Sequence, residues 1–156
     1  MATPQSLETP QFLHIRDSLQ MVWVLKGNSL IAVPSSNNVK PVILALVSCT
    51  DQKLKKEEKD NLVYLGIRGM NLCLFCAEIQ GQPTLQLKEK DIMDLYHMSE
   101  GQKPFLFLHI LEGSTSAFQS LSYPDWFIAT SSMAGQPITL SKERGKTDNT
   151  NFHLEV

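Results

Sequence analysis

Residues 118–138 read FQSLSYPDWFIATSSMAGQPI, two short apolar segments separated by a turn signal. Pro124 holds φ at about −65° at the second turn position and Asp125 suits the third, so these residues predict a type I β-turn. The flanking segments, Ser116–Leu121 and Trp126–Thr130, are predicted to be strands. The second strand opens with three bulky side chains, more than an exposed hairpin requires. Part of this hairpin should therefore pack against the body of the protein.

The second half of this hairpin has a counterpart elsewhere in the chain. GQPTLQLKEK begins at Gly81, and GQPITLSKER begins at Gly135, 54 residues later. The same offset places Leu72–Cys76 on Trp126–Thr130, and a weaker third copy begins at Val22. The apolar positions slip by one residue between the two clear copies. Three such units predict a β-trefoil, in which barrel closure removes exposed strand edges; an eight-stranded barrel or a sandwich is the alternative.

The rest of the chain alternates short apolar runs with turn residues, which indicates an all-β fold of about twelve strands. The predicted strands are Phe12–Asp17, Gln20–Lys26, Ser29–Pro34, Pro41–Cys49, Asn61–Ile67, Asn71–Glu78, Pro83–Lys88, Pro104–Ile110, Thr115–Ser120, Trp126–Thr130, Pro137–Ser141 and Asn151–Val156. Residues 91–96 have helical spacing and predict one short helical turn that Asp91 caps. Thr50–Asp60 is charged and lacks an apolar period, so we expect a solvated loop there.

The composition is that of one globular domain. The chain has 156 residues, 42% of them hydrophobic and 19% charged, so it can bury a sizeable core without metals or disulfides. Residues 1–11 contain two prolines and few apolar side chains. We expect them to be a disordered N-terminal leader that precedes a single domain at residues 12–156.

Charge and hydropathy exclude several classes of function. A net charge of −2 does not favour binding to nucleic acid. No apolar run is as long as a transmembrane helix, and residues 1–20 lack the apolar segment of a signal peptide. We therefore expect a chain that is made in the cytoplasm and does not insert into membranes.

The three cysteines do not form a recognisable metal or redox site. Cys73 and Cys76 have C-x-x-C spacing, but in a strand their side chains point to opposite faces, so one ion cannot bind both. Together with Cys49 they make an odd count, which is unlike a disulfide framework. The four histidines are scattered, and no nucleophile elbow or phosphate-binding loop is present. We predict no enzyme, no metal and no cofactor.

Two other functions of trefoils lack their usual residues. Sugar-binding trefoils repeat a Gln-x-Trp signature, but neither Trp23 nor Trp126 follows that pattern. Heparin-binding growth factors carry a basic cluster, whereas Lys53, Lys55, Lys56 and Lys59 are offset by the acidic residues Asp51, Glu57, Glu58 and Asp60. A carbohydrate-binding module remains the alternative from another functional class.

The segment at residues 118–138 resembles the signature of the interleukin-1 family. The matching residues are Phe118, Ser120, Leu121, Pro124, Phe127, Ile128, Ala129, Thr130 and Ile138. The resemblance covers nearly the whole chain. Further stretches, including IMDLY at Ile92–Tyr96 and CLFCAEIQG at Cys73–Gly81, are similar to the interleukin-36 branch of that family. The family fold is the β-trefoil that the repeats predict separately.

The resemblance implies a secreted pro-inflammatory cytokine, released without a signal peptide, that acts as a monomer. It implies binding to the interleukin-36 receptor, recruitment of the interleukin-1 receptor accessory protein, and signalling through NF-kappa-B and MAP kinases. A receptor antagonist of the same fold is the alternative. It also implies that a protease trims the leader upstream of an aliphatic-x-Asp motif, which fits Ile15-Arg16-Asp17 and places the mature start near Ser6.

The family further implies that two connections contact the receptors. They correspond to Thr50–Asp60 and Arg144–Thr150 in this chain. The residues predicted to make the contacts are Lys53, Lys55, Lys56, Glu57, Arg144, Lys146, Asp148 and Asn149. Mixed charge in the first connection suits it to steering encounter and partner choice.

Overall fold

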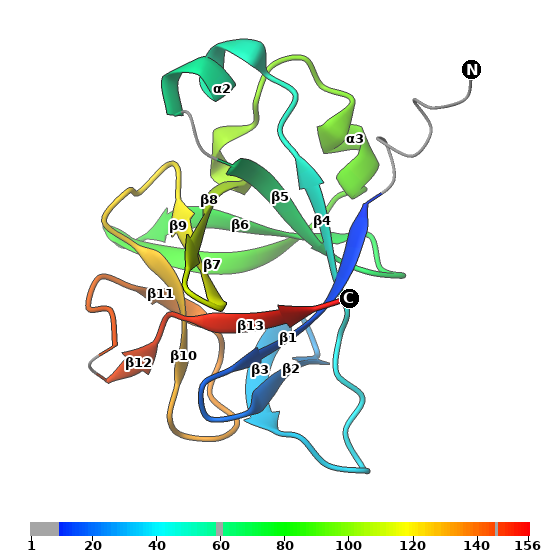
Figure 1. The fold of residues 1–156 in the computed structure, drawn as a ribbon, viewed down its shortest axis with the longest axis vertical. Helices are drawn as coiled ribbons and strands as arrows, with labels where there is room; N and C mark the ends of the chain where they lie inside the picture. Colours follow the sequence, from blue (N-terminus) through cyan, green and yellow to red (C-terminus); the bar gives the residue numbers. More distant parts are fainter. Residues whose placement is uncertain (1–9, 59–60, 146) are drawn as a thin grey trace.

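The computed structural model describes residues 10–58, 61–145 and 147–156, which form a 13-stranded sheet and short helices (Figure 1). The strands are β1 (Gln11–Asp17), β2 (Met21–Lys26), β3 (Ser29–Pro34), β4 (Leu44–Ser48), β5 (Asn61–Ile67), β6 (Leu72–Ile79), β7 (Gln82–Glu89), β8 (Leu106–Glu112), β9 (Thr115–Ser120), β10 (Phe127–Ser131), β11 (Thr139–Ser141), β12 (Asp148–Asn149) and β13 (Phe152–Glu155). The helices are α2 (Gln52–Glu58), α3 (Ile92–Tyr96) and the 3₁₀ turn η1 (Lys103–Phe105). No helix in these ranges is long and apolar enough to cross a membrane.

Six of the strands close a barrel. β1 pairs with β4 and β13, β4 with β5, β5 with β8, β8 with β9, and β9 with β13, all antiparallel. Closure leaves none of these six strands as an unpaired edge. The hairpins β2–β3, β6–β7 and β10–β11 stand outside the ring. A six-stranded barrel with three further hairpins is a β-trefoil, as the repeats predict.

The one-residue slip between the repeats is a difference in hairpin register. Leu74 of β6 pairs with Leu87. A strict repeat with an offset of 54 residues would pair Ile128 of β10 with Ser141, but Ile128 pairs with Leu140. The connection between the paired residues is one residue shorter in the β10–β11 hairpin. This change keeps the apolar side chains of both hairpins directed at the core.

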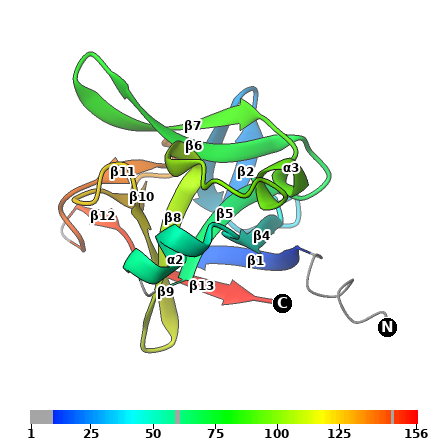
Figure 2. The same ribbon diagram turned by 90° about the horizontal axis from the view of Figure 1, so that it is seen from above.

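The β6–β7 hairpin turns through Gln80 and Gly81, whose φ values are 52° and 79°. Two consecutive positive φ values are those of a type I′ turn, whose twist matches that of the flanking strands. Glycine adopts the second of these without strain. Figure 2 shows that this hairpin tip and the β8–β9 tip project on opposite sides of the molecule.

The core consists of two clusters on either side of the sheet. The larger cluster unites the barrel and the three hairpins, and it contains Trp23, Leu74, Ile128 and Phe152 at 0% exposure. The Trp23 and Phe152 rings pack edge to face, with centroids 5.5 Å apart and an interplanar angle of 87°. The smaller cluster lies beneath α2 and α3.

Most sequence predictions agree with these elements. Asp91 caps α3 as expected, because its Oδ1 accepts a hydrogen bond of 3.0 Å from the Met93 amide. The turn after β9 closes by a 2.9 Å bond from the Trp126 amide to the Tyr123 carbonyl. The structure starts β1 at Gln11, inside the range expected for the leader, and residues 1–9 lie outside the described residues.

Two predicted strand starts and one expected loop were wrong, and one strand was missed. β4 begins at residue 44 rather than 41, and β8 begins at residue 106, after η1 rather than at residue 104. The short strand β12, which pairs with β10, has no counterpart in the prediction. The expected loop at residues 50–60 forms α2 instead.

Helix α2 forms because Asp51 caps it and one leucine anchors it. Asp51 Oδ1 accepts bonds from the Lys53 and Leu54 amides at 2.9 and 3.1 Å, and its Oδ2 accepts one of 2.7 Å from the Gly101 amide. These hydrogen bonds, the Gly101 bond foremost, lower the pKa of Asp51. Residues 52–58 are good helix formers, so an N-cap aspartate before them was a signal for α2 in the sequence.

Candidate functional site

The family-like signature is almost entirely part of the core. Phe118, Ser120, Ile128 and Thr130 are fully buried, and Ile138 is 5% exposed. Of the remaining signature residues, Phe127 is half-buried and Pro124 is exposed at the turn. Most of these residues therefore hold the third lobe together.

The signature is tied directly to the predicted processing motif. Asp17 is fully buried, and its Oδ2 accepts a 2.6 Å hydrogen bond from Thr130 Oγ1. Its Oδ1 accepts bonds from the amides of Leu19 and Met21, at 2.8 and 3.0 Å. The carboxylate thus fixes the turn between β1 and β2 and connects it to β10. Its role in the folded chain is structural.

The other two residues of the motif also lie in the body of the fold. Ile15 is in the larger core cluster, and Arg16 is half-buried with Nη2 3.9 Å from Glu155 Oε1. The predicted mature start near Ser6 is outside the described residues. The motif therefore marks the position of β1, and trimming at Ser6 remains a prediction.

The first predicted contact segment is a solvent-exposed helix face. Lys53, Lys55, Lys56 and Glu57 are all exposed on α2, whereas Leu54 is buried against the smaller core cluster. A Cβ at Gly101 would overlap Leu54 Cδ1, which shows how closely α2 approaches the chain beneath it. Figure 1 shows α2 and α3 at the same end of the molecule. The lysines are therefore displayed from a packed helix rather than from a loop.

The second predicted contact segment is held by a cluster around Arg144. Arg144 Nη1 and Nη2 donate to the two Glu112 carboxylate oxygens at 2.9 and 2.6 Å, and its Nε donates to Thr150 Oγ1 at 3.3 Å. Its guanidinium lies over the Phe127 ring, 4.4 Å from the centroid. Asn151 Nδ2 donates to Glu112 at 2.7 Å. We call these five residues the Arg144 clamp; it joins the β8–β9 tip to the last connection.

The structure separates the residues that were predicted together in that connection. Asp148 and Asn149 form β12 and pair with Ser131 and Thr130 of β10. Asn149 Oδ1 also accepts a 2.9 Å bond from Ser18 Oγ. Lys146 is outside the described residues. Sequence reasoning missed Glu112, because it is 32 residues from Arg144 and no local pattern joins them.

The Arg144 clamp makes the free energy of unfolding depend on pH in the acidic range. Hydrogen bonds from Arg144, then from Asn151, lower the pKa of Glu112 to about 2. Since this folded pKa lies below the unfolded value of about 4.3, the stabilisation is complete above about pH 4.5 and is lost as the pH falls toward 2. Both side chains are partly exposed, at 31% and 37%, so the contribution is about 1 kcal/mol at most.

Urea unfolding of wild type and Glu112→Gln at pH 7, 4.5 and 3 measures this dependence. We expect the difference in free energy of unfolding between the two proteins to shrink as the pH falls. Glu78→Gln, at an exposed glutamate of β6, serves as the control and should leave the wild-type pH profile unchanged. An identical pH profile for Glu112→Gln would contradict the role of the clamp.

The cysteines are buried and unpaired. Cys49, Cys73 and Cys76 are each at most 2% exposed and are free thiols. Cys73 belongs to the smaller core cluster and Cys76 to the larger one, which confirms that they face opposite sides of the sheet. Burial raises the pKa of Cys73 to about 12 and of Cys76 to about 11. Neither thiol has reactive thiolate character at neutral pH.

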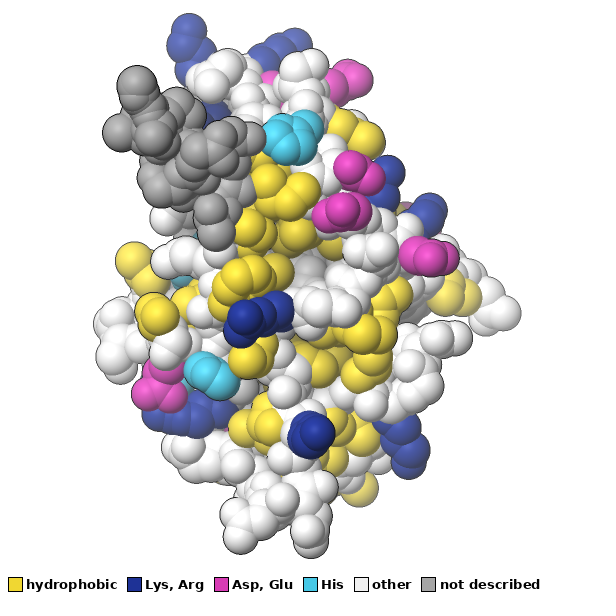
Figure 3. Space-filling model, turned by 90° about the vertical axis from the view of Figure 1, so that its right-hand side faces the viewer, with side chains coloured by type: hydrophobic (Ala, Val, Ile, Leu, Met, Phe, Trp, Pro, Cys, Tyr) yellow, Lys and Arg dark blue, Asp and Glu magenta, His cyan; other side chains and the backbone are white. Residues whose placement is uncertain are grey.

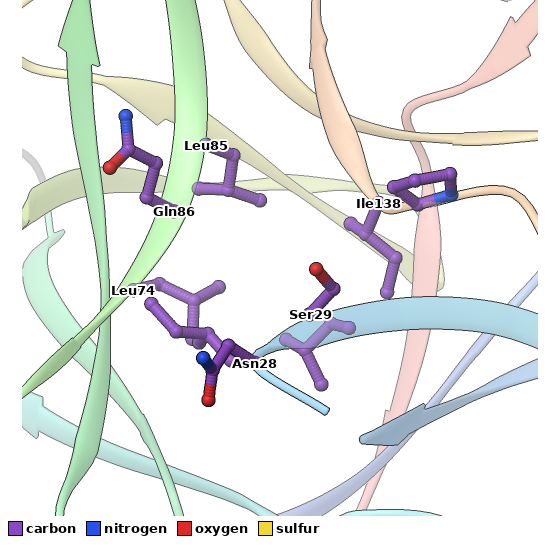
Figure 4. Close-up of a pocket in the computed structure, with 9 residues that line it drawn as sticks. Asn28, Ser29, Leu74, Leu85, Gln86 and Ile138 are labelled. Atoms are coloured by element: carbon purple, nitrogen blue, oxygen red, sulfur yellow. The ribbon is translucent and has the colours of Figure 1, made fainter. Parts of the chain in front are cut away.

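A pocket of about 290 Å³ lies where the three hairpins meet (Figure 4). Leu74 and Leu85 from the second hairpin and Ile138 from the third surround it, with Ser29 from the first at its rim. The first and third hairpins are joined by a 2.9 Å bond from the Ile138 amide to the Leu30 carbonyl. The second packs against them through side chains, which leaves this space. Its lining holds no charged group.

Among the described residues, no group of three histidine, cysteine or carboxylate side chains could hold a metal ion. The described surface instead offers two candidate contact regions, the α2 lysines and the Arg144 clamp with the β8–β9 tip. Both are polar and charged, which suits recognition of another protein.

Known proteins resemble this chain in sequence and in fold. A family model described as Interleukin-1 / 18 matches residues 33–154. The chain is 58% identical over 150 residues to interleukin-36 beta of Mus musculus, covering 96% of this chain and 82% of that protein. It is 49% identical over 150 residues to interleukin-36 alpha of Homo sapiens, covering 96% and 95%.

Solved structures show the same likeness. An NMR structure of the pro-inflammatory cytokine interleukin-36 alpha superposes with a TM-score of 0.76 at 46% identity, covering 91% of this chain and 92% of the other. A crystal structure of chicken interleukin 1 beta superposes with a TM-score of 0.77 at 27% identity, covering 95% and 97%.

Proposed function

This chain belongs to the interleukin-1 family, within its interleukin-36 branch, and we propose that it acts outside the cell as a pro-inflammatory agonist. It binds the interleukin-36 receptor and recruits the interleukin-1 receptor accessory protein. The assembled complex then signals through NF-kappa-B and MAP kinases. The chain leaves the cell without a signal peptide, and trimming to a start near Ser6 activates it.

The observation that carries this proposal is similarity to interleukin-36 proteins along 96% of the chain. One solved relative, interleukin-36 alpha, is a pro-inflammatory cytokine, which favours an agonist. The proposal fits the division of the molecule into a buried signature and exposed charged regions, since a cytokine works by surface recognition. The α2 lysines supply one contact region, and the Arg144 clamp with the β8–β9 tip supplies the other.

A reporter assay tests agonism and trimming together. The full chain and a version that starts at Ser6 are added to cells bearing both receptor chains and an NF-kappa-B reporter. We expect the Ser6 version to signal at a concentration at least about tenfold lower, a change of about 1.4 kcal/mol in apparent affinity. Cells without the accessory protein are the control and should not respond.

The same assay separates the alternatives. If neither version signals but either blocks interleukin-36 alpha, the chain is a receptor antagonist. If neither version binds the receptor, the receptor assignment fails, and binding to a carbohydrate array would then test the remaining alternative.

A further inference from the structure

A shallow hollow of about 330 Å³ opens at the point where the described chain begins. Its walls come from four places in the fold: the start of β1, strand β4, the β5–β6 turn and the start of α3. The lining residues that define it are Phe12, Ala45, Ile67, Arg68, Met70 and Asp91. We call it the β1 hollow. Figure 3 shows hydrophobic side chains gathered over this face of the molecule.

The floor of the β1 hollow is apolar. Ala45 and Ile67 are buried in it, and Phe12 and Ile92 are half-buried. Met70 at the rim is 49% exposed, one of the few large hydrophobic side chains exposed in the described part of the chain. A single aliphatic side chain placed here would remove apolar surface of both partners from water.

The rim of the hollow carries one charge of each sign. The Arg68 guanidinium lies over the Phe12 ring, 4.5 Å from the centroid. Asp91 caps α3 through Oδ1, and its carboxylate faces solvent. An occupant that complements this hollow has an apolar side chain between an acidic group and a basic group.

We propose that, once the chain starts at Ser6, residues 6–9 occupy the β1 hollow, with Leu7 on its floor and the new α-amino group beside Asp91. This inference rests on the trimming in the proposed function. It gives the trimmed end a defined position next to α3, whereas trimming alone would only shorten the chain.

The segment has the length and chemistry that the hollow requires. Pro10 is itself part of the wall, and the four preceding residues span about 13 Å when extended. Leu7 is the only aliphatic side chain among Ser6, Leu7, Glu8 and Thr9. Glu8 supplies the negative group for Arg68, and the freed amine supplies the positive group for Asp91.

The fit depends on the cut. In the full chain the nitrogen of Ser6 belongs to a neutral peptide bond, and the α-amino group lies five residues further from the hollow. Asp91 then has no positive partner from this segment. Docking is therefore stronger in the trimmed protein.

NMR of the Ser6 version and the full chain tests docking directly. We expect cross-peaks between the Leu7 methyl groups and those of Ile67 and Ile92 in the Ser6 version, and weaker ones in the full chain. Asp91→Asn should weaken the cross-peaks while it keeps α3, since asparagine also caps helices. Asp94→Asn, at the next exposed aspartate on α3, should leave them unchanged. Absence of the cross-peaks in the Ser6 version overturns the inference.

Substitution at the rim supplies a second test with a matched control. Met70→Lys places a charged chain in the hollow and should abolish the Leu7 cross-peaks. Met133→Lys makes the same change at another exposed methionine, 66% exposed and outside the hollow, and should preserve them. Sedimentation must show a monomer, because a dimer that Met70→Lys disrupts would mean that a second copy fills the hollow.

The reporter assay keeps this inference distinct from the proposed function. Leu7→Asp in the Ser6 version should raise the half-maximal concentration by about tenfold. If the Ser6 version signals and Leu7→Asp matches it, docking does not contribute to activation, and the link between docking and trimming fails while the agonist proposal stands. If trimming has no effect on signalling but the cross-peaks are present, the activation proposal fails and the docking stands.

Discussion

Asp17→Ala is expected to lower the free energy of unfolding by about 3–4 kcal/mol. The substitution removes a buried carboxylate that accepts three hydrogen bonds, from Thr130 Oγ1 and from the amides of Leu19 and Met21. Two of the donors, the Thr130 hydroxyl and the Met21 amide, are buried and then have no acceptor. Leaving a buried donor without an acceptor costs about 1–3 kcal/mol. In a chain of this length the melting temperature should fall by about 10 °C. Urea and thermal unfolding, followed by tryptophan fluorescence, measure both quantities.

Two further variants show whether the carboxylate acts through these bonds. Thr130→Val keeps the shape of the side chain and removes one of the three hydrogen bonds to Asp17. It should therefore lower the free energy of unfolding by less than Asp17→Ala does. Asp94→Ala, at an exposed position on α3, should change stability by no more than about 0.5 kcal/mol. If Asp17→Ala had the same melting temperature as Asp94→Ala, the Asp17 carboxylate would not be holding the β1–β2 turn to β10.

Leu54→Ala is expected to lower the free energy of unfolding by about 2–3 kcal/mol, the lower part of the range for a buried leucine. Leu54 is 7% exposed and is the buried side chain by which α2 packs on the smaller core cluster. Its loss leaves α2 held mainly by the Asp51 cap. The three lysines on α2 would then lose their fixed orientation. Signalling should therefore fall by more than the decrease in the fraction of folded protein explains.

Leu19→Ala is the matched control, since Leu19 is 53% exposed in the turn after β1. It should alter stability by less than about 0.5 kcal/mol. Far-UV circular dichroism at 20 °C confirms that each variant is folded before the reporter assay. Full potency of a folded Leu54→Ala protein would exclude α2 as a contact region, although the stability prediction could still hold.

The sequence was informative about the fold because local chemistry repeats in it. Turn residues such as Pro124 and Gly81 act within a few residues, and strand alternation is visible in any short window. The 54-residue repeat then indicated three lobes, and the structure shows the barrel and hairpins that this implies. Even the one-residue slip proved to be a register difference between β6–β7 and β10–β11.

Helix α2 shows where local patterns were insufficient. A single apolar residue, Leu54, cannot produce a hydrophobic period, so residues 50–60 resembled a solvated loop. The helix is stable because Asp51 bonds to Gly101, 50 residues away, and because Leu54 packs against the chain there. The capping aspartate was the one local signal.

By itself, the sequence determined the all-β trefoil, the helical turn that Asp91 caps, the opposed cysteines and the family. Only the tertiary structure decided what the marked residues do. It buries Asp17 against Thr130, 113 residues away, and it commits Arg144 to Glu112, 32 residues away. Hydrogen bonds and ion pairs between distant residues leave no periodic trace in a single chain. Whether a charge is buried, paired or exposed is therefore decided only when the strands have closed around it.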